Sequence, residues 1–152
     1  MAYFMGHHVD ADVAQWRLTN GFSLLELLLV VALIGILAAF AVPTYKTYLQ
    51  KTRFMEVIQH SHAIRVAQSA CLLQVGDNIG ACDTFTELTL PSPSASTNIQ
   101  SITLTVTTGR ITGTGTTAAG GYTFTLTPSI DDAGLLSYAI DGSCVDVGFC
   151  GR

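Results

Sequence analysis

A single acidic side chain near the start of a long apolar run constrains this chain more than any other feature. The run extends from Phe22 to Val42, and only Ser23 and Glu26 within it are strongly polar. As a helix at about 1.5 Å per residue it is roughly 30 Å long, which matches the hydrocarbon core of a bilayer. A carboxylate at the centre of such a span costs about 2.5–3.5 kcal/mol on insertion scales, so an acid there indicates a functional site. The sequence therefore raises the question of what Glu26 pairs with.

The cysteines indicate an exported chain. An even set of four behind an export-type segment predicts two disulfides in an oxidising compartment. These cysteines are Cys71, Cys82, Cys144 and Cys150. Their spacing is too loose for a zinc site, so we expect no metal. Four cysteines allow three pairings. Sequential pairing, Cys71–Cys82 and Cys144–Cys150, is favoured because short loops close easily, with about 2–3 kcal/mol of stabilisation for each bond.

The charges are unevenly distributed along the chain. Charged residues make up only 12% of the sequence and hydrophobic residues 49%. Lys46, Lys51 and Arg53 follow the apolar run, whereas residues 67–152 contain seven acidic side chains against two basic ones. Such an acidic part repels phosphate backbones, so we expect no nucleic-acid site on its surface.

Beyond Pro43 a stripe of apolar and small residues recurs at spacings of three and four, which predicts an amphipathic helix. The stripe consists of Phe54, Val57, Ile58, Ser61, Ile64, Ala67, Ala70, Cys71 and Val75. Polar residues lie between them, namely Arg53, Glu56, Gln59, His60, His62 and Gln68. The pattern predicts one helix from Phe22 to Gln74, roughly 80 Å long, that ends at Gly76-Asp77-Asn78. We expect Pro43 to kink this helix and Gly35 to weaken it locally.

Residues 76–98 are predicted to form a surface connection, after which alternation predicts strands. The apolar faces are Ile102, Leu104 and Val106; then Tyr122, Phe124 and Leu126, stopped by Pro128; then Leu136, Tyr138 and Ile140. A short strand at Arg110–Thr114 would pair with the first of these through a turn at Thr108-Gly109. Asp131-Asp132-Ala133-Gly134 is predicted to form a hairpin turn. Such a sheet needs a second layer, and the apolar stripe of residues 54–75 is the available one.

We find no pattern of catalytic residues in the sequence. Neither a Ser/His/Asp nor a Cys/His set is evident, so we expect no enzyme activity and no cofactor. His60 and His62 are predicted to lie on different helix faces, solvated or facing another subunit. Tyr45 and Tyr48 are expected to pack at a membrane–water interface or in a filament core.

The stretch from Gly21 to Ala38 (GFSLLELLLVVALIGILA) resembles the amino-terminal signature of type IV pilins, and Pro43, Tyr45 and Tyr48 continue the resemblance. The resemblance implies an α+β pilin fold. One long helix would pack on a roughly four-stranded antiparallel sheet that is followed by a disulfide-closed carboxyl-terminal loop. The implied parts are a leader at 1–21, a hydrophobic transmembrane or filament-core segment at 22–53 and a head at 54–152. Within the head, 76–98 is the connecting loop, 99–141 the sheet and 142–152 the terminal loop.

The resemblance also implies roles for single residues. Gly21 would be the last leader residue, cut by a prepilin peptidase, and Phe22 would become an N-methylated amino terminus. Glu26 would then pair with the new amine of Phe22 on a neighbouring subunit. A cation and a carboxylate attract strongly at low dielectric, which favours a fixed register. Gly35 and Pro43 would permit local loss of helix in the filament.

The leader departs from the family pattern. The Phe-first pilins that the chain resembles have short basic leaders, whereas residues 1–21 contain Arg17 against Asp10 and Asp12. This is a poor cytoplasmic flank by the positive-inside rule. We expect that translation begins at Val13 rather than Met1, which gives a shorter leader ending at Gly21.

Other classes of protein share some of these features. An ordinary signal peptide could end at Ala39-Phe40-Ala41, before Val42, and would place a secreted binding domain outside the cell. A plain single-pass anchor would also explain the apolar run. Neither accounts for Glu26. Within the same fold, a type II secretion pseudopilin is the alternative, and the Cys144–Cys150 loop favours the pilus.

The expected function is that of a structural subunit, of the major kind, in an extracellular type IV pilus. Adhesion, twitching motility and DNA uptake are the outcomes that the family implies. The expected partners are further copies of the chain, a prepilin peptidase and a pilus assembly machinery with separate ATPases. The chain would lie in the inner membrane before assembly and in the fimbrium on the bacterial surface afterwards.

Overall fold

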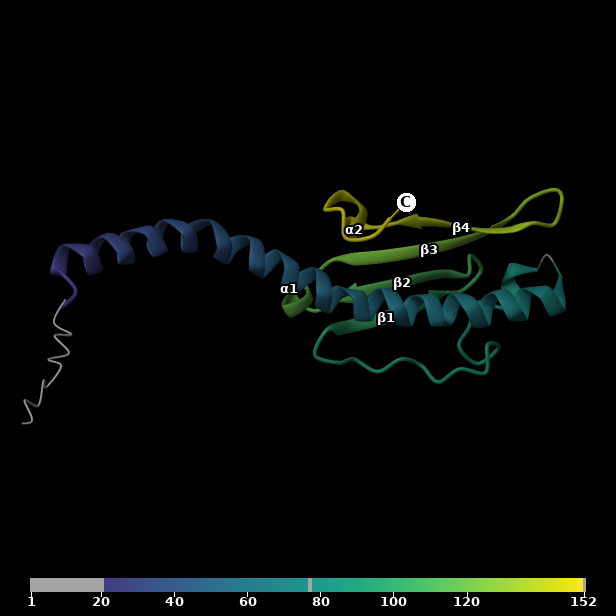
Figure 1. The fold of residues 1–152 in the computed structure, drawn as a ribbon. Coiled ribbons are helices and arrows are strands. Elements are labelled where there is room, and N and C mark those ends of the chain that lie inside the picture. Colours follow the sequence, from purple (N-terminus) through teal and green to yellow (C-terminus); the bar gives the residue numbers. More distant parts are fainter. Residues whose placement is uncertain (1–20, 77, 152) are drawn as a thin grey trace, which may run out of the picture. The chain divides into compact units, whose positions relative to one another are not determined.

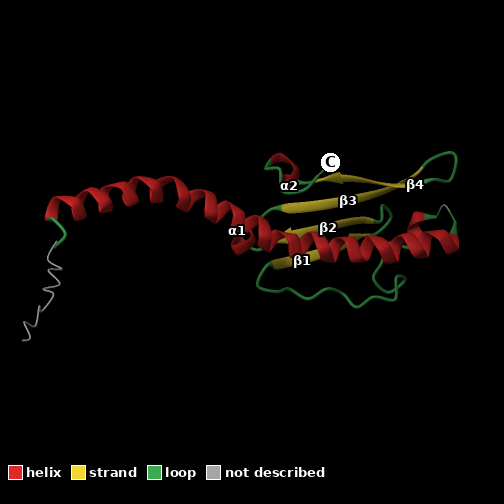
Figure 2. Cartoon of the chain, viewed as in Figure 1, coloured by secondary structure: helices red, strands yellow, loops and turns green. Residues whose placement is uncertain are grey.

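The computed structural model describes residues 21–76 and 78–151, so most of the expected leader, with Arg17 and Val13, lies outside the described residues. The helices are α1 (Leu24–Val75), η1 (Ile79–Ala81), η2 (Thr117–Ala119) and α2 (Ser143–Asp146). The strands are β1 (Ile99–Thr105), β2 (Arg110–Gly115), β3 (Thr123–Ile130) and β4 (Leu136–Asp141). One long helix and one antiparallel sheet form the α+β fold that was predicted (Figures 1 and 2).

Helix α1 contains 52 residues and lies within two residues of the predicted bounds. It ends before Gly76, whose φ of 76° is the left-handed conformation that glycine adopts after a helix. The chain divides into two compact units between Ala39 and Phe40. The second unit, Phe40–Arg152, contains the sheet and the part of α1 that packs on it.

The four strands lie in the order β1-β2-β3-β4 and each pairs antiparallel with the next. Three consecutive hairpins make this sheet, and two of them contain the predicted turns. In the first turn the Gly109 amide donates to the Thr105 carbonyl over 2.9 Å. In the last, the Asp131 carboxylate accepts from the Ala133 and Leu135 amides over 3.0 and 2.8 Å.

The prediction that Pro128 stops its strand is wrong. Strand β3 continues to Ile130, and Pro128 lies opposite Tyr138 of β4. Proline has no backbone N–H, so in a strand that is paired on both sides it leaves one hydrogen bond of the ladder unmade. Strand β2 pairs with β3 only as far as Leu126, so Pro128 lies where β3 has a partner on one side. On the side of β3 where β2 no longer pairs with it, no hydrogen bond of the ladder needs a donor from Pro128.

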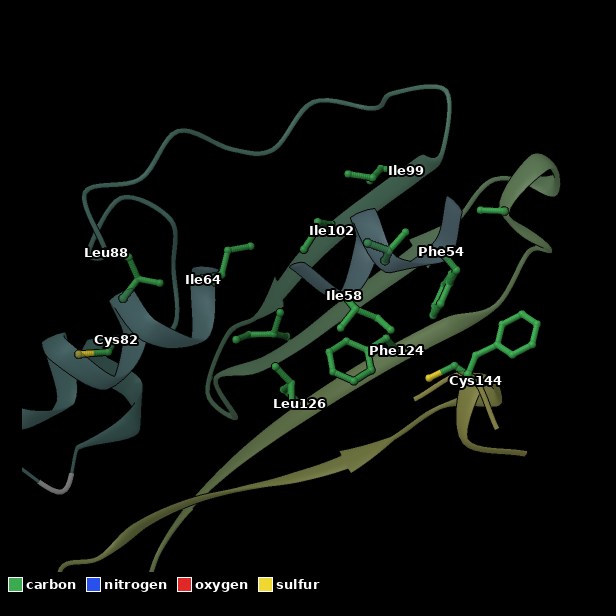
Figure 3. Close-up of a cluster of buried hydrophobic side chains, with 14 of the residues drawn as sticks. Phe54, Ile58, Ile64, Cys82, Leu88, Ile99, Ile102, Phe124, Leu126 and Cys144 are labelled. Carbon is green, nitrogen blue, oxygen red and sulfur yellow. The ribbon is translucent and has the colours of Figure 1, made fainter. Parts of the chain in front are cut away.

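One face of α1 packs against the sheet to form the core. Figure 3 shows Phe54, Ile58 and Ile64 of the helix among side chains of the strands, such as Ile102, Phe124 and Leu126. The sheet residues fully buried beneath them include Ile111, Phe124 and Leu126. Each such side chain contributes roughly 1.5–3 kcal/mol when it is buried. The predicted second layer is therefore confirmed.

Close approach between α1 and β2 depends on a glycine. A Cβ placed on Gly113 would lie 2.7 Å from both the Ser61 hydroxyl and a methyl of Val57. Any larger side chain at this position would push the helix away from the strand. Ser61 is itself fully buried, and its hydroxyl donates to the Val57 carbonyl over 2.9 Å.

The packed face of α1 differs from the predicted stripe at its far end. Gln68 and Leu72 are buried, whereas Ala70 and Val75 are exposed. Val106 is also exposed, because β1 ends at Thr105 and the chain turns there. The apolar pattern missed Gln68 because its burial depends on hydrogen-bond partners from other segments.

The Gln68 amide is satisfied on all sides. Its nitrogen donates to the carbonyls of Cys82 and Gly109 over 3.1 and 2.8 Å. Its oxygen accepts from the Tyr138 hydroxyl over 3.2 Å. That hydroxyl also lies 3.1 Å from Ser69 Oγ. The network joins α1 to the connecting loop, to the β1–β2 turn and to β4.

His62 lies on a different face of α1 from His60, as predicted, and is half-buried rather than solvated. Its ring lies edge-on to Phe124, with 5.4 Å between centroids. Its Nδ1 atom is buried and has no hydrogen-bond partner among the described residues. Burial, helped by the nearby charge of Arg65, lowers the pKa of His62 below its ordinary value. His60 is exposed.

Replacing Gln68 with Leu should strongly destabilise the protein. The Cys82 and Gly109 carbonyls would lose their donor, and each orphaned buried group costs roughly 1–3 kcal/mol, so we expect a loss of about 2–4 kcal/mol. Denaturant unfolding of the full chain in detergent, followed by circular dichroism, measures this. Gln59→Leu, at an exposed position of the same helix, should change stability by less than about 0.5 kcal/mol. Equal effects from the two variants would contradict the role of the network.

His62 should make stability depend on pH. A folded-state pKa below the unfolded value of about 6.5 means that the unfolded chain binds the proton more readily. The unchanged protein should therefore lose stability as the pH falls below about 6.5. His62→Phe keeps the aromatic contact with Phe124 and should remove this part of the pH dependence. Thermal unfolding between pH 5 and 8 measures it, with exposed His60→Phe as the control. Identical pH profiles for His62→Phe and the unchanged chain would refute the assignment.

Candidate processing and assembly segment

The bond between Gly21 and Phe22 lies in accessible, non-helical backbone. Residues 21–23 precede α1, and all three are exposed. The Phe22 side chain is 76% exposed, although it is large and apolar. A peptidase needs backbone that is reachable and outside regular structure, and residues 21–23 meet both conditions. The geometry is therefore compatible with cleavage at the predicted site.

Ser23 and Glu26 lie at the start of α1. The Ser23 carbonyl accepts from the Leu27 amide over 3.1 Å, which makes Ser23 the residue before the first turn. Serine followed three residues later by glutamate is the spacing of a capping box. A carboxylate in the first turn is also favoured by the helix dipole. Sequence reasoning missed the S-x-x-E pattern, which is typical of a helix start.

Glu26 is exposed, like every residue of the apolar segment from Leu24 to Val42. The exposed fractions of large side chains here include 77% at Leu24 and 73% at Phe40. In the described part of the chain, α1 is the one helix long and apolar enough to cross a membrane. A continuous apolar surface of this size needs lipid or other protein to cover it. The Glu26 carboxylate is accessible within that surface.

Gly35 and Pro43 both lie inside α1, in helical conformation. Pro43 has no N–H, so it cannot donate to the carbonyl of Ala39, four residues earlier. The division between the two compact units falls directly after Ala39. Just beyond it the Thr44 hydroxyl donates to the Phe40 carbonyl over 3.1 Å. That the two residues permit local unwinding remains a prediction.

The four cysteines form two disulfides, and both lie in the second unit. Cys71 pairs with Cys82, and Cys144 pairs with Cys150. This is the sequential pairing favoured by the sequence. The first bond joins the end of α1 to the connecting loop, and the second closes a ring that contains α2. No further cysteine is free in the described chain.

Aromatic side chains anchor the carboxyl-terminal ring to α1. Phe149 is buried and lies 4.9 Å from the Tyr122 ring, which in turn lies 6.0 Å from Phe54. Lys51 donates to the Gly148 carbonyl over 3.4 Å, and its ammonium lies 5.9 Å from the Phe149 ring. The ring is therefore part of the packed structure. Sequence reasoning missed this anchor, because residues 51 and 149 meet only after folding.

Apart from Gly35 and Pro43 inside α1, the predicted site residues form two groups. Gly21, Phe22 and Glu26 lie together at the start of α1, whereas the disulfides lie in the second unit. Among residues 21–76 and 78–151, no three His, Cys, Asp or Glu side chains are close enough to share a metal ion. The arrangement offers a cleavable bond, an apolar surface and one carboxylate.

Comparison with known proteins identifies this segment. A family model described as the prokaryotic N-terminal methylation motif matches residues 16–42. That range contains Gly21, Phe22 and Glu26, together with Gly35. The match therefore centres on the segment that the sequence singled out.

Relatives extend the similarity beyond this segment. The prepilin peptidase-dependent protein D of Escherichia coli K12 is 31% identical over 114 residues, which cover 75% of each chain. The type IV major fimbrial protein FimA of Dichelobacter nodosus is 42% identical over 65 residues, or 43% of this chain and 41% of FimA. A fimbrial protein of Pseudomonas aeruginosa is 36% identical over 89 residues, or 53% of this chain and 58% of the relative. The matches to these two fimbrial proteins span less than two thirds of their length.

The matched motif lies on the exposed start of α1, and the longest of these matches covers three quarters of the chain. The helix, the antiparallel sheet and the carboxyl-terminal disulfide agree with the fold that this similarity implies. The chain is a pilin-like structural subunit and belongs to the type IV pilin family.

Proposed function

We propose that the chain is a subunit of an extracellular type IV pilus, assembled from many copies through the amino-terminal part of α1. The observation that supports this most directly is the wholly exposed apolar segment from Leu24 to Val42. Before assembly, the inner membrane would cover it. In the filament, the same segments of neighbouring copies would cover one another.

Cleavage after Gly21 would create the amine that pairs with Glu26. A prepilin peptidase would cut after Gly21, and the released amine of Phe22 would be methylated and remain cationic. Glu26 of one copy would then pair with that amine on the next copy. Two charges that are each costly in an apolar environment attract strongly there, which would fix the register between copies. Before cleavage the amine does not exist, so processing would precede assembly.

A pseudopilin of type II secretion is the second candidate. The name of the Escherichia coli relative mentions dependence on prepilin peptidase, which fits either class. The ring closed by Cys144–Cys150 favours the pilus, because pseudopilins that the chain resembles tend to lack it. The names of the other two relatives are fimbrial. Within the pilus, we propose a major subunit that serves adhesion, twitching motility or DNA uptake.

The mass of the mature protein tests the processing step. We expect an amino terminus at N-methylated Phe22, because the Gly21–Phe22 bond is the proposed cleavage site. Intact-mass spectrometry of the protein from bacterial membranes measures it. Ala41→Leu would block an ordinary signal-peptide site at 39–41 and should leave the mature mass unchanged apart from the substitution. A mature chain that starts at Val42 would refute the proposal and support a secreted domain.

Substitutions of Glu26 separate its charge from its helix-capping role. Glutamine keeps the capping-box pattern but removes the charge. Glu26→Gln and Glu26→Ala should therefore both give processed, membrane-held chains that assemble poorly, measured as the yield of filaments sheared from cells. Ser23→Ala weakens the cap by about 1 kcal/mol and keeps the charge, so it should retain filaments.

The result for glutamine decides between the two roles. Normal filament yield from Glu26→Gln, together with a loss in Ser23→Ala, would show that Glu26 acts as a cap only.

A further inference from the structure

Exposed charges lie at both ends of the sheet in the second unit. The hydrogen bonds described for Lys51 and Arg53 go to backbone carbonyls, those of Gly148 and Ala118. These exposed cations can therefore also meet carboxylates of another molecule. The positions of these charges along the sheet indicate the kind of molecule that could bind them.

A basic collar lies at one end, made by Lys46, Lys51 and Arg53 of α1, all of which are exposed. The Arg53 guanidinium donates to the Ala118 carbonyl over 3.2 Å, in the segment between β2 and β3. Beside the collar is an open groove of about 480 Å³. Its lining residues include Pro43, Tyr48 and Phe149, with Lys51 among them.

An acidic hairpin tip lies at the other end, made by Asp131, Asp132 and Leu135 between β3 and β4. All three are exposed, and Leu135 shows 66% of its surface. Strand β3 has eight residues, which places the tip roughly 25 Å from the start of that strand. Figure 1 shows the β3–β4 loop at the end of the sheet opposite α2.

We propose that the acidic hairpin tip of one copy docks on the basic collar of a second copy. The inference rests on the proposed pilus, because it supplies a contact between subunits. The two surfaces differ, have opposite charge and lie at opposite ends. A head-to-tail contact of this kind generates an open filament when its rotation does not close a ring. Leu135 would enter the apolar groove beside Tyr48, while Asp131 and Asp132 meet the collar.

Each end also contains charges of the other sign, which makes the orientation specific. Asp141 and Asp146 lie at the collar end, while Arg65 and Arg110 lie at the hairpin end. The net charge of each end therefore does not decide which ends meet. Reversing the charges of two named residues can decide it, because the double reversal restores attraction only if the two residues contact each other.

Charge reversal in the full chain tests the contact. Asp132 and Lys46 are suitable, because Asp131 holds the turn and Lys51 contacts Phe149 within its own copy. Asp132→Lys and Lys46→Asp should each lower the yield of sheared filaments by about fivefold, a factor that corresponds to about 1 kcal/mol per contact. The double variant should restore most of the yield. Asp141→Lys makes the same change of charge at the collar end and should not lower it.

The outcomes are distinguishable from those of the proposed function. If the unchanged chain is absent from filaments, the pilus proposal fails and the docking proposal fails with it. If the unchanged chain forms filaments and Asp132→Lys does so equally well, only the docking proposal is overturned. Loss in both single variants without rescue in the double variant would also overturn it, because another protein would then be the partner. Detergent extracts should show equal thermal stability for all variants.

Discussion

The amide of Gln68 holds together parts of the chain that are distant in sequence. From the buried face of α1 it bonds the carbonyls of Cys82 and Gly109 and the hydroxyl of Tyr138. These groups belong to the connecting loop, the β1–β2 turn and β4. A buried polar group must be satisfied, so each of these segments has one permitted position over the helix. Gly113 allows the same helix to lie close to β2. Apolar burial provides the driving force, and the amide fixes the register.

Much of this fold could be predicted from the sequence, because periodicity reports how each segment meets its neighbours. The extent of α1, the four strands and the turn at Asp131 all followed from local patterns. Gln68, His62 and Pro128 did not. The burial of Gln68 depends on carbonyls that other segments supply, and Pro128 is tolerated because β2 ends its pairing at Leu126. Gly21, Phe22 and Glu26 could be proposed from the sequence because their motif is contiguous. The collar and the hairpin tip could not, because each is made by residues that only the fold brings to one end of the sheet.

The two parts of helix α1 have different surroundings, although the helix is continuous. Its first part is apolar on all sides and wholly exposed, so its sequence is adapted to lipid or to other copies. Its second part is apolar on one face only, and that face is covered by the sheet. The change occurs near Pro43, where the helix lacks a backbone bond and the two compact units meet. Because the sheet packs on the second part alone, the fold of that part does not depend on what covers the first part.

The two disulfides close rings between residues separated by only 11 and 6 positions, and neither bond crosses the sheet. Under the proposed export, each ring would lie within a short stretch that reaches the oxidising compartment together. Cys71 and Cys82 would then be oxidised before Cys144 has arrived to compete for either thiol. That order of emergence would favour the observed pairing without an isomerase.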